Sequence, residues 1–568
     1  MRKERAMAKT SRQTLKAVLS RAKSSRFLLI PSLLLAAVSA ASALYIPILV
    51  GDGIDLIIGS GMVDFKALVP ILLRAAAVAA AAAPAQYLMN RLNNKIAYNT
   101  VRELRCEAFG RLHRLPMNYF DTNPTGDILS RLTTDADQLA DGLIMSLTQL
   151  FTGVFTIIGT LALMLSLDPW IALAVIILTP LSLFTARFIS SKTYSMFGIQ
   201  SQVRGKQTSF IEERINNIKL TKAYSDLDDT EARFDKINDR LEKCSVKAIF
   251  FSSLTNPTTR FVNNLVYAVV ALFGTLAVIG GGLTVGGLSC LLSYASQYAK
   301  PFNEISGVIA EMQNSLACGA RLIELTEEPE ENPDPEDAVE LENVRGNVEF
   351  RDVSFSYVKG KPLLHDINIS VPEGRTAAIT GPTGCGKTTL INLLMRFYDV
   401  DGGCIFIDGT DITKITRESL RRNFAMVLQD TWLKSGTVRE NIAFGRPDAT
   451  DEEILSAARS AHALGFIRRL PDGLNTVIGE SGGTLSQGQR QLLCIARAML
   501  CLPPMLILDE ATSSIDMLTE EKIRLGFDAM MKGRTSFVVA HRLSTVRNAD
   551  LRLEFHDGTV TQRQGRGA

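Results

Sequence analysis

Eight consecutive residues in the C-terminal half have the types and spacing that bind the phosphates of a nucleotide. They are Gly381-Pro-Thr-Gly-Cys-Gly-Lys-Thr388, and they follow the pattern G-x-x-x-x-G-K-T. Glycines let successive backbone N–H groups converge on one point without side chains in the way. Lys387 adds a positive charge for the outer phosphates, and the Thr388 hydroxyl is a ligand for Mg²⁺. The segment therefore predicts a site for a nucleotide and its magnesium ion.

The flanking residues predict the strand and the helix that such a loop needs. Residues 376–380 form an apolar run that suits a buried strand, and residues 389–395 suit a helix whose N-terminus points at the phosphates. The alternative is a chance glycine-rich turn, and this strand–loop–helix setting argues against it.

A second apolar run is followed directly by two acidic residues. Residues 505–508 are apolar, and Asp509 and Glu510 follow them directly. Ligands of open α/β sheets lie at the carboxyl ends of the strands. Asp509 is therefore a candidate to hold Mg²⁺, directly or through water, and Glu510 is a candidate general base for the attacking water.

Three more side chains end predicted strands. Gln429 closes residues 424–428 and can reach Mg²⁺ and the water, while His541 closes 536–540 and can orient the γ-phosphate. Tyr357 ends an alternating strand, 24 residues before the loop, where an aromatic ring can stack on a base. A lone histidine or tyrosine is also common as a structural residue, so these two assignments depend on their context.

The rest of the composition separates two halves. The chain has 568 residues, too many for one domain, and its 61 basic and 59 acidic residues give no reason to expect a nucleic-acid partner. The eight cysteines include no C-x-x-C pair, so neither a zinc site nor a disulfide framework is indicated. Long uncharged runs occur only in the first half.

Those runs predict six membrane spans, because about 20 apolar residues cross a bilayer. The last run, of 39 residues, is broken by a glycine-rich turn at 280–287 and is counted as two helices. The runs are Phe27–Val50, Ala75–Met89, Gly142–Leu167, Pro169–Ala186 and Phe261–Ala299.

Lys and Arg residues set the predicted orientation. Residues 1–26 carry nine, 90–141 carry seven and 187–260 carry thirteen, whereas the connections on the other side carry one, Lys66. Both termini are therefore expected on the cytoplasmic side of the plasma (cytoplasmic) membrane. The apolar spacing of the two long connections favours helices that extend far out of the membrane over ordinary loops.

The predicted fold is an all-α transmembrane domain of six long helices followed by an α/β domain. We expect a basic cytoplasmic segment at 1–26, the transmembrane domain at 27–325, an acidic linker at 326–344 and the nucleotide-binding domain at 345–568. The linker is rich in acids and prolines, so we expect a solvated connector without a binding role.

The order of the motifs resembles that of ATP-binding-cassette (ABC) transporters. Six spans ahead of one cassette resemble the exporter half-transporters, and segments 119–127 and 214–222 are similar to the coupling segments of that family. The motifs that carry the resemblance are Tyr357, the phosphate loop, Gln429, Leu485-Ser-Gln-Gly-Gln489, the strand ending at Asp509-Glu510, Ser513-Ser-Ile-Asp516 and His541.

The resemblance implies a nucleotide held between the phosphate loop of one cassette and the signature 485–489 of another, so that the chain works as half of a homodimer or heterodimer. It assigns catalysis to Glu510 and His541, and Mg²⁺ to Thr388, Gln429 and Asp509. It assigns ATP to Tyr357, Gly381, Gly384, Cys385, Gly386, Lys387, Thr388, Thr389, Gln429, Ser486, Gln487, Gly488, Gln489 and Asp516.

Two positions bear on that site. Gln487 replaces the first glycine of the family's LSGGQ pentapeptide, and its bulk is expected to weaken the half-site without abolishing function. Cys385 places a thiol beside the phosphates.

The implied function is ATP-driven export of amphipathic or hydrophobic compounds, drug-like or lipid-like, by alternating access. The alternative is a non-transporting regulator or an ATP-gated channel on the same scaffold, and six spans argue against a soluble ATPase. The expected partners are a second half-transporter, membrane lipids and a small amphipathic substrate. The spans also contain polar residues that could line a cavity, but we favour hydrogen bonds between helices as their role. These residues are Gln149, Asn256, Arg260, Asn263 and Asn264.

Overall fold

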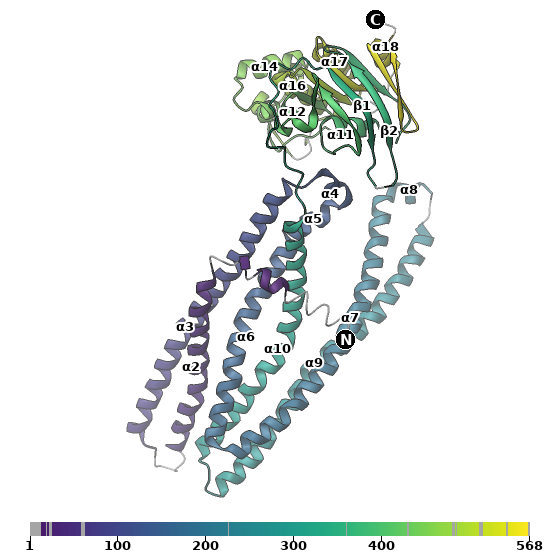
Figure 1. Cartoon of the computed structure of the whole chain (residues 1–568). Helices are drawn as coiled ribbons and strands as arrows, with labels where there is room; N and C mark the ends of the chain where they lie inside the picture. The colour runs from purple at the N-terminus through teal and green to yellow at the C-terminus, as the bar shows by residue number, and fades with distance from the viewer. Residues whose placement is uncertain are drawn as a thin grey trace. The chain divides into compact units, whose positions relative to one another are not determined.

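The computed structural model describes residues 13–18, 20–21, 25–57, 63–224, 227–358, 360–428, 431–479, 483, 485–509, 515–540 and 543–565. The chain divides into two compact units (Figure 1). The helical unit holds residues 1–113 and 125–328, and the C-terminal unit holds 114–124 and 329–568.

Six long helices build the helical unit. They are α2 (Leu29–Asp55), α3 (Phe65–Leu112), α6 (Thr134–Leu167), α7 (Pro169–Asn216), α9 (Leu227–Ile279) and α10 (Val285–Glu327), with the short α5 (Thr125–Leu132) and α8 (Ile218–Ala223) between them. A rise of 1.5 Å per residue makes the 48 residues of α3 about 72 Å long, more than twice the thickness of a hydrocarbon core. The prediction that the long connections are helices is confirmed.

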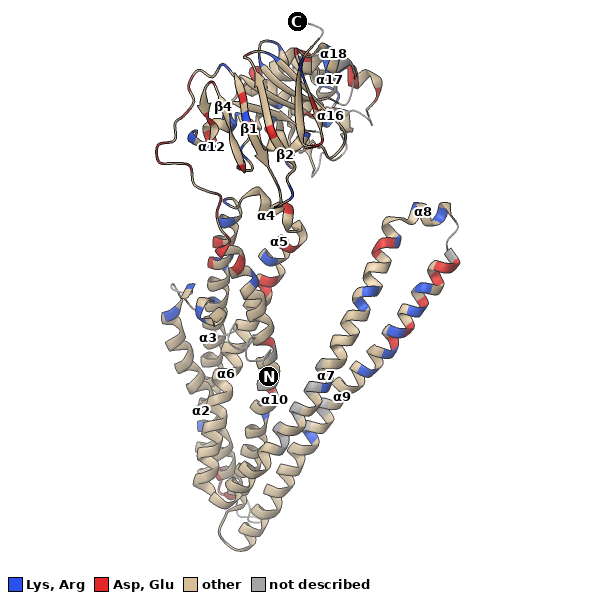
Figure 2. Ribbon diagram, turned by 45° about the vertical axis from the view of Figure 1, so that its right-hand side comes forward, with Lys and Arg blue, Asp and Glu red and all other residues tan. Residues whose placement is uncertain are grey.

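Four helices are long and apolar enough to cross a membrane within the part of the chain that the structure describes. Their stretches are Arg26–Asp55, Phe65–Leu112, Thr125–Leu167 and Arg260–Ile279, and Pro169–Pro180 is a shorter apolar helix. Most charged residues of this unit lie toward the α5 and α8 ends of the helices (Figure 2). A total of six spans stays a prediction.

Glycine allows the closest helix approach at one end of the unit. A Cβ on Gly286, near the start of α10, would lie 2.1 Å from the carbonyl oxygen of Gly51 in α2. The Gly286 N–H also donates to the Asp55 carboxylate at 2.7 Å. These contacts join the C-terminal end of α2 to the N-terminal end of α10.

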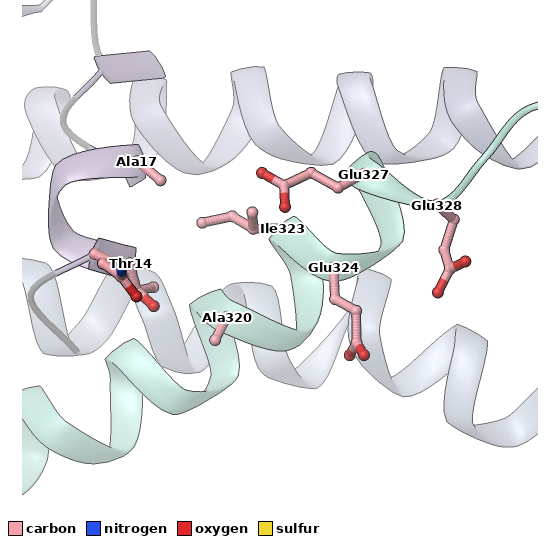
Figure 3. A pocket seen from close by; sticks show the side chains of 8 residues that line it. Thr14, Ala17, Ala320, Ile323, Glu324, Glu327 and Glu328 are labelled. Carbon is pink, nitrogen blue, oxygen red and sulfur yellow. The ribbon is translucent and has the colours of Figure 1, made fainter. Parts of the chain in front are cut away.

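A short helix near the N-terminus does not face the solvent on all sides. Residues 13–18 are helical and lie beside the last turns of α10, with Thr14 and Ala17 across a cavity of about 370 Å³ from Ala320 and Ile323 (Figure 3). Val18 is fully buried. The segment therefore packs onto the helices, and Leu19 lies outside the described residues.

Two sheets form the framework of the C-terminal unit. One is antiparallel, in the order β2-β1-β4-β5, and the other has the order β12-β11-β3-β10-β9-β6, in which the pairs from β11 to β6 are parallel. The strands are β1 (Val348–Phe355), β2 (Leu364–Val371), β3 (Thr376–Thr380), β4 (Gly402–Ile407), β5 (Thr410–Asp411), β6 (Phe424–Val427), β7 (Gly436–Thr437), β8 (Val477–Ile478), β9 (Met505–Asp509), β10 (Thr535–Val539), β11 (Leu551–His556) and β12 (Thr559–Gln564).

Helices complete two hydrophobic cores. One core joins both sheets to α11, and the other lies under α13, α14, α16 and α17. The helices are α4 (Met117–Thr122), α11 (Lys387–Leu394), α12 (Arg417–Arg422), α13 (Val438–Ile442), α14 (Asp451–Ser460), α15 (Leu464–Ile467), α16 (Gln487–Cys501), α17 (Met517–Met531) and α18 (Leu543–Asn548). The predicted α/β class of this half is confirmed.

The linker is exposed along most of its length, but two of its acids also pack against the C-terminal unit. Arg417 is almost fully buried and binds two linker carboxylates, Asp334 at 2.6 Å and Glu331 at 3.0 Å. Arg396, also buried, approaches Asp334 at 3.3 Å. The acids of the linker are therefore used to compensate buried arginines, which the count of charges alone does not reveal.

Replacing Asp334 with alanine is expected to destabilise the C-terminal unit by about 3 kcal/mol, because two buried guanidinium groups lose a shared carboxylate. Thermal unfolding of the purified full-length protein, followed by fluorescence, measures the effect. Glu336→Ala is the matched control, since Glu336 is an exposed acid of the same segment. Equal melting temperatures for the two variants would contradict the assignment.

Candidate functional site: a phosphate loop and a signature helix

The phosphate loop connects β3 to α11, as predicted. Gly381, Gly384 and Gly386 have φ angles of 148°, 84° and 101°, in a region that side chains rarely adopt. Gly386 is the N-cap of α11, whose first helical residue is Lys387. The loop thus directs the N–H groups of a helix N-terminus toward one point, which is the geometry that binds phosphate.

Lys387 lies across this loop. Its ammonium donates to the carbonyl oxygens of Gly381 at 2.9 Å and Pro382 at 2.8 Å, and lies 3.9 Å from the Cys385 sulfur. A phosphate entering the loop meets this cation directly. The Cys385 thiol is half-buried in the same place, as expected for a residue beside the phosphates.

Tyr357 lies next to the first turn of α11. Its hydroxyl is 3.2 Å from the Thr389 hydroxyl, and its ring makes edge contacts with Phe355 and Tyr398 at centroid distances of 4.9 and 5.1 Å. Tyr357 is 39% exposed, which leaves surface for a base to stack on. The structure thus brings Tyr357 to the loop, although it is separated from it by 24 residues.

Asp509 ends β9 at the carboxyl edge of the parallel sheet, where the loop also leaves β3. One strand, β10, separates β3 from β9. The Thr388 hydroxyl and the Asp509 carboxylate are the hard oxygen ligands that Mg²⁺ prefers, so the donor set fits an ATP–Mg²⁺ complex. Gln429, Glu510 and His541 lie outside the described residues, so their roles stay predictions.

The signature opens a helix. Ser486 is the N-cap of α16: its hydroxyl oxygen accepts from the Gln489 N–H at 3.3 Å, and its own N–H donates to the Gln489 side chain at 3.0 Å. The Gln489 carboxamide therefore stabilises the helix start. The Ser486 hydroxyl keeps its proton for a phosphate oxygen.

Gly488 is needed for packing. A Cβ at this position would lie 2.4 Å from the Thr519 methyl group of α17 and 3.0 Å from Ile515. Gln487 beside it is only half-buried, so the helix accepts a side chain there. This difference explains how one glycine of the signature can be replaced while the next is retained.

Asp516 begins α17. Its carboxylate accepts from the Thr519 N–H at 2.9 Å. This backbone hydrogen bond lowers the pKa of the Asp516 carboxyl, so the side chain stays ionised at neutral pH. It acts here as a helix cap, and its contact with nucleotide stays a prediction.

A tyrosine in the same cluster contacts the segment 114–124. The Tyr398 hydroxyl donates to the Asp121 carboxylate of α4, within the C-terminal unit. Burial, and then this hydrogen bond, raises the pKa of the Tyr398 phenol. Sequence reasoning missed Tyr398, because a tyrosine after a helix has no distinguishing local signal.

Comparison with known proteins agrees with this geometry. Residues 29–302 match the family model described as ABC transporter transmembrane region, and residues 364–513 match the family model described as ABC transporter. The chain is 41% identical over 512 residues to a fatty acid ABC transporter ATP-binding/permease protein of Mycobacterium bovis, covering 90% of this chain and 81% of that one. The chain belongs to the ABC transporter family.

Two further relatives of this ABC transporter have names that refer to different substrates. A putative multidrug export ATP-binding/permease protein of Bacillus subtilis is 35% identical over 84% of this chain and 83% of its own. An ATP-dependent lipid A-core flippase of Vibrio cholerae is 35% identical over 82% of each chain. The ABC transporter is thus an ATP-hydrolysing half-transporter with its membrane and nucleotide-binding regions fused.

Alkylation of Cys385 is expected to lower the ATP affinity of the ABC transporter at least about tenfold, because the added group occupies the loop beside Lys387. ATP added before N-ethylmaleimide should protect the protein. A Cys385→Ala variant is the control and should resist the reagent, which also reaches the exposed Cys106 and Cys501. Alkylated protein with full ATP affinity would refute the prediction.

Gln487→Gly is expected to raise the rate of ATP hydrolysis at least about twofold, because it removes bulk where a partner's nucleotide approaches. Turnover of Mg·ATP by the purified transporter measures it. Gly488→Ala is the contrasting variant and should lower both activity and melting temperature through its clash with Thr519. An unchanged or lower rate in Gln487→Gly would count against a role for this residue at the half-site.

Proposed function

We propose that this chain exports amphipathic or hydrophobic compounds across the plasma membrane as one half of a dimer, with both termini in the cytoplasm. The observation that carries the proposal is a phosphate loop and a signature helix in one chain that also has a membrane region. The names of the relatives, which refer to fatty acids, lipid A-core and drugs, support a substrate with a large apolar part.

The chemistry of the site supports a dimer. Ser486 and the N–H groups of α16 offer donors to a γ-phosphate, and the phosphate loop binds the same nucleotide from the other side. In the proposed assembly these two surfaces come from different chains, so each nucleotide joins two protomers. Binding energy that differs between the open and closed pairs then drives the membrane helices between two states.

Tyr398 and Asp121 support a connection between the nucleotide and the membrane region. The ring of Tyr398 touches that of Tyr357, whose hydroxyl reaches α11, and the hydroxyl of Tyr398 holds α4. Movement at the nucleotide base is therefore transmitted through two adjacent rings to the segment that continues into α5. Hydrolysis, with Glu510 as the proposed base, resets the cycle.

The alternative is a regulator or ATP-gated channel on the same scaffold. A gate can operate without hydrolysis, whereas a pump hydrolyses ATP in every cycle, so the acid at position 510 favours the pump.

The second alternative concerns the partner in the dimer. We favour a heterodimer over a homodimer because of Gln487, and the mass of complexes from mixed expression tests this choice.

Glu510→Gln is expected to lower ATP hydrolysis at least about a hundredfold and to abolish uptake into inside-out vesicles, since the attacking water loses its base. The measurement uses fluorescent amphiphiles and Mg·ATP in vesicles that contain the whole transporter. Glu373→Gln, at an exposed acid of the same unit, is the control and should transport normally. Ion conductance that persists in Glu510→Gln without any uptake would favour the channel instead.

A further inference from the structure

A cavity with charged walls interrupts the helical unit. It has a volume of about 330 Å³ and is lined by α2, α6 and α10, with Ala43 on the first of these helices. Its polar residues are Thr152 and Thr156 of α6 and Gln297, Lys300 and Glu304 of α10. This volume lies at the lower end of the range for small-molecule sites and is suited to a lipid headgroup.

The depth of the cavity can be estimated from the helix ends. Asp55 and Gly286 bond to each other, so the end of α2 and the start of α10 lie at one level. At 1.5 Å per residue, Lys300 lies about 22 Å and Glu304 about 28 Å along α10 from Val285. The hydrocarbon core is about 30 Å thick. With the predicted span of α10 starting at Val285, Lys300 lies inside the hydrocarbon core and Glu304 lies at the border of the core farther from Asp55.

Neither charge is neutralised by the part of the chain that the structure describes. Lys300 and Glu304 are both exposed, and they form no ion pair or hydrogen bond with a described residue. Charges at this depth are costly, and those retained in transporters mark pathways and substrate sites. A structural pair would be expected to bond directly across its one-turn spacing, and this pair does not.

Several groups in the walls of the cavity can only accept hydrogen bonds from a ligand. The hydroxyl of Thr152 donates to the Thr148 carbonyl at 2.7 Å, and that of Thr156 donates to the Thr152 carbonyl at 2.8 Å. Each hydroxyl has one proton, so both offer only lone pairs to the cavity. Pro301 has no N–H, which leaves the Gln297 carbonyl without its usual helical partner.

The cavity thus has several acceptors, one of them the Glu304 carboxylate, together with Lys300 as its cationic donor and the Gln297 carboxamide, which can donate and accept. An anion alone would pair with Lys300 but would face Glu304 and leave the acceptors without donors. A quaternary ammonium group would bring a positive charge but no N–H. A primary ammonium next to an anionic group satisfies both: the ammonium donates to the acceptors and Glu304, and the anionic group pairs with Lys300.

We propose that the α2–α6–α10 cavity binds the headgroup of a zwitterionic amphiphile that carries a primary ammonium beside an anionic group, as phosphoethanolamine does. Lys300 holds the anionic group. Glu304 and the two threonine hydroxyls hold the ammonium. The inference rests on the proposed export function and specifies its substrate class.

The signal for this site was present in the sequence but was missed. The uncharged run 261–299 ends directly before Lys300. The polar residues considered as cavity-lining candidates were others, such as Gln149 and Asn263. Only the packing of α6 against α10 brings two threonines to face Lys300 and Glu304.

The test is ATP-dependent movement of acyl-labelled lipids by the whole transporter in liposomes. The probes share one acyl chain and differ in headgroup: phosphatidylethanolamine, phosphatidylcholine, phosphatidylglycerol and the free fatty acid. We expect phosphatidylethanolamine to move at least about tenfold faster than the other three, because the site's donors and acceptors stay unpaired with them. Equal rates for all probes would overturn the inference.

Variants separate recognition from structure. Glu304→Gln should reverse the preference toward phosphatidylglycerol and the fatty acid, since Lys300 then lacks a counter-charge, and Lys300→Ala should slow phosphatidylethanolamine about tenfold. Gln313→Ala, at an exposed position of α10 outside the cavity, should leave the rates and preference of the intact protein unchanged. An unaltered headgroup ratio in Glu304→Gln would also overturn the inference.

The two proposals fail in different ways. If phosphatidylglycerol or fatty acid moves with ATP and phosphatidylethanolamine has no advantage, the export function stands and the headgroup assignment falls. If no probe moves with ATP while the protein hydrolyses ATP, the export function itself is refuted for amphiphiles, and the headgroup assignment falls with it.

Discussion

Close packing around the glycines of the phosphate loop is the constraint on which the C-terminal unit depends. A Cβ on Gly386 would lie 2.6 Å from Leu364 of β2, and one on Gly381 would lie 2.7 Å from the Phe555 carbonyl of β11. These contacts come from different sheets. The loop is therefore held between both sheets, and the backbone that binds phosphate is also the backbone that joins the two layers.

At the signature, too, the residues assigned to binding also hold the fold together. Ser486, Gln489 and Asp516 complete helix ends with their side chains, and Gly488 lets α16 approach α17. Residues that the family resemblance assigns to ATP thus also stabilise the fold. Their replacement affects stability and binding together, so measurements of binding alone do not separate the two.

The two units differ in how their buried or membrane-facing charges are paired. In the C-terminal unit the linker acids meet the buried Arg396 and Arg417, and the cost of burying those guanidinium groups is offset by carboxylates. In the helical unit Lys300 and Glu304 are left without such partners among the described residues. That contrast, within one chain, is what distinguishes a structural ion pair from a site that has room for a ligand.

The sequence by itself determined the two-part organisation, the long helices, the phosphate loop and the helix that starts at Gln487. These features follow from local patterns: uncharged runs, apolar periodicity and glycines at required positions. Asp509 at the end of β9 was likewise predictable, because apolar strands and their acidic ends are adjacent in the chain. Only the tertiary structure placed Tyr357 against Thr389 and Tyr398, the linker acids on buried arginines, and Thr152 and Thr156 opposite Lys300. These partners are separated by many residues, and which of them meet is decided by helix and sheet packing, for which no single segment carries a signal.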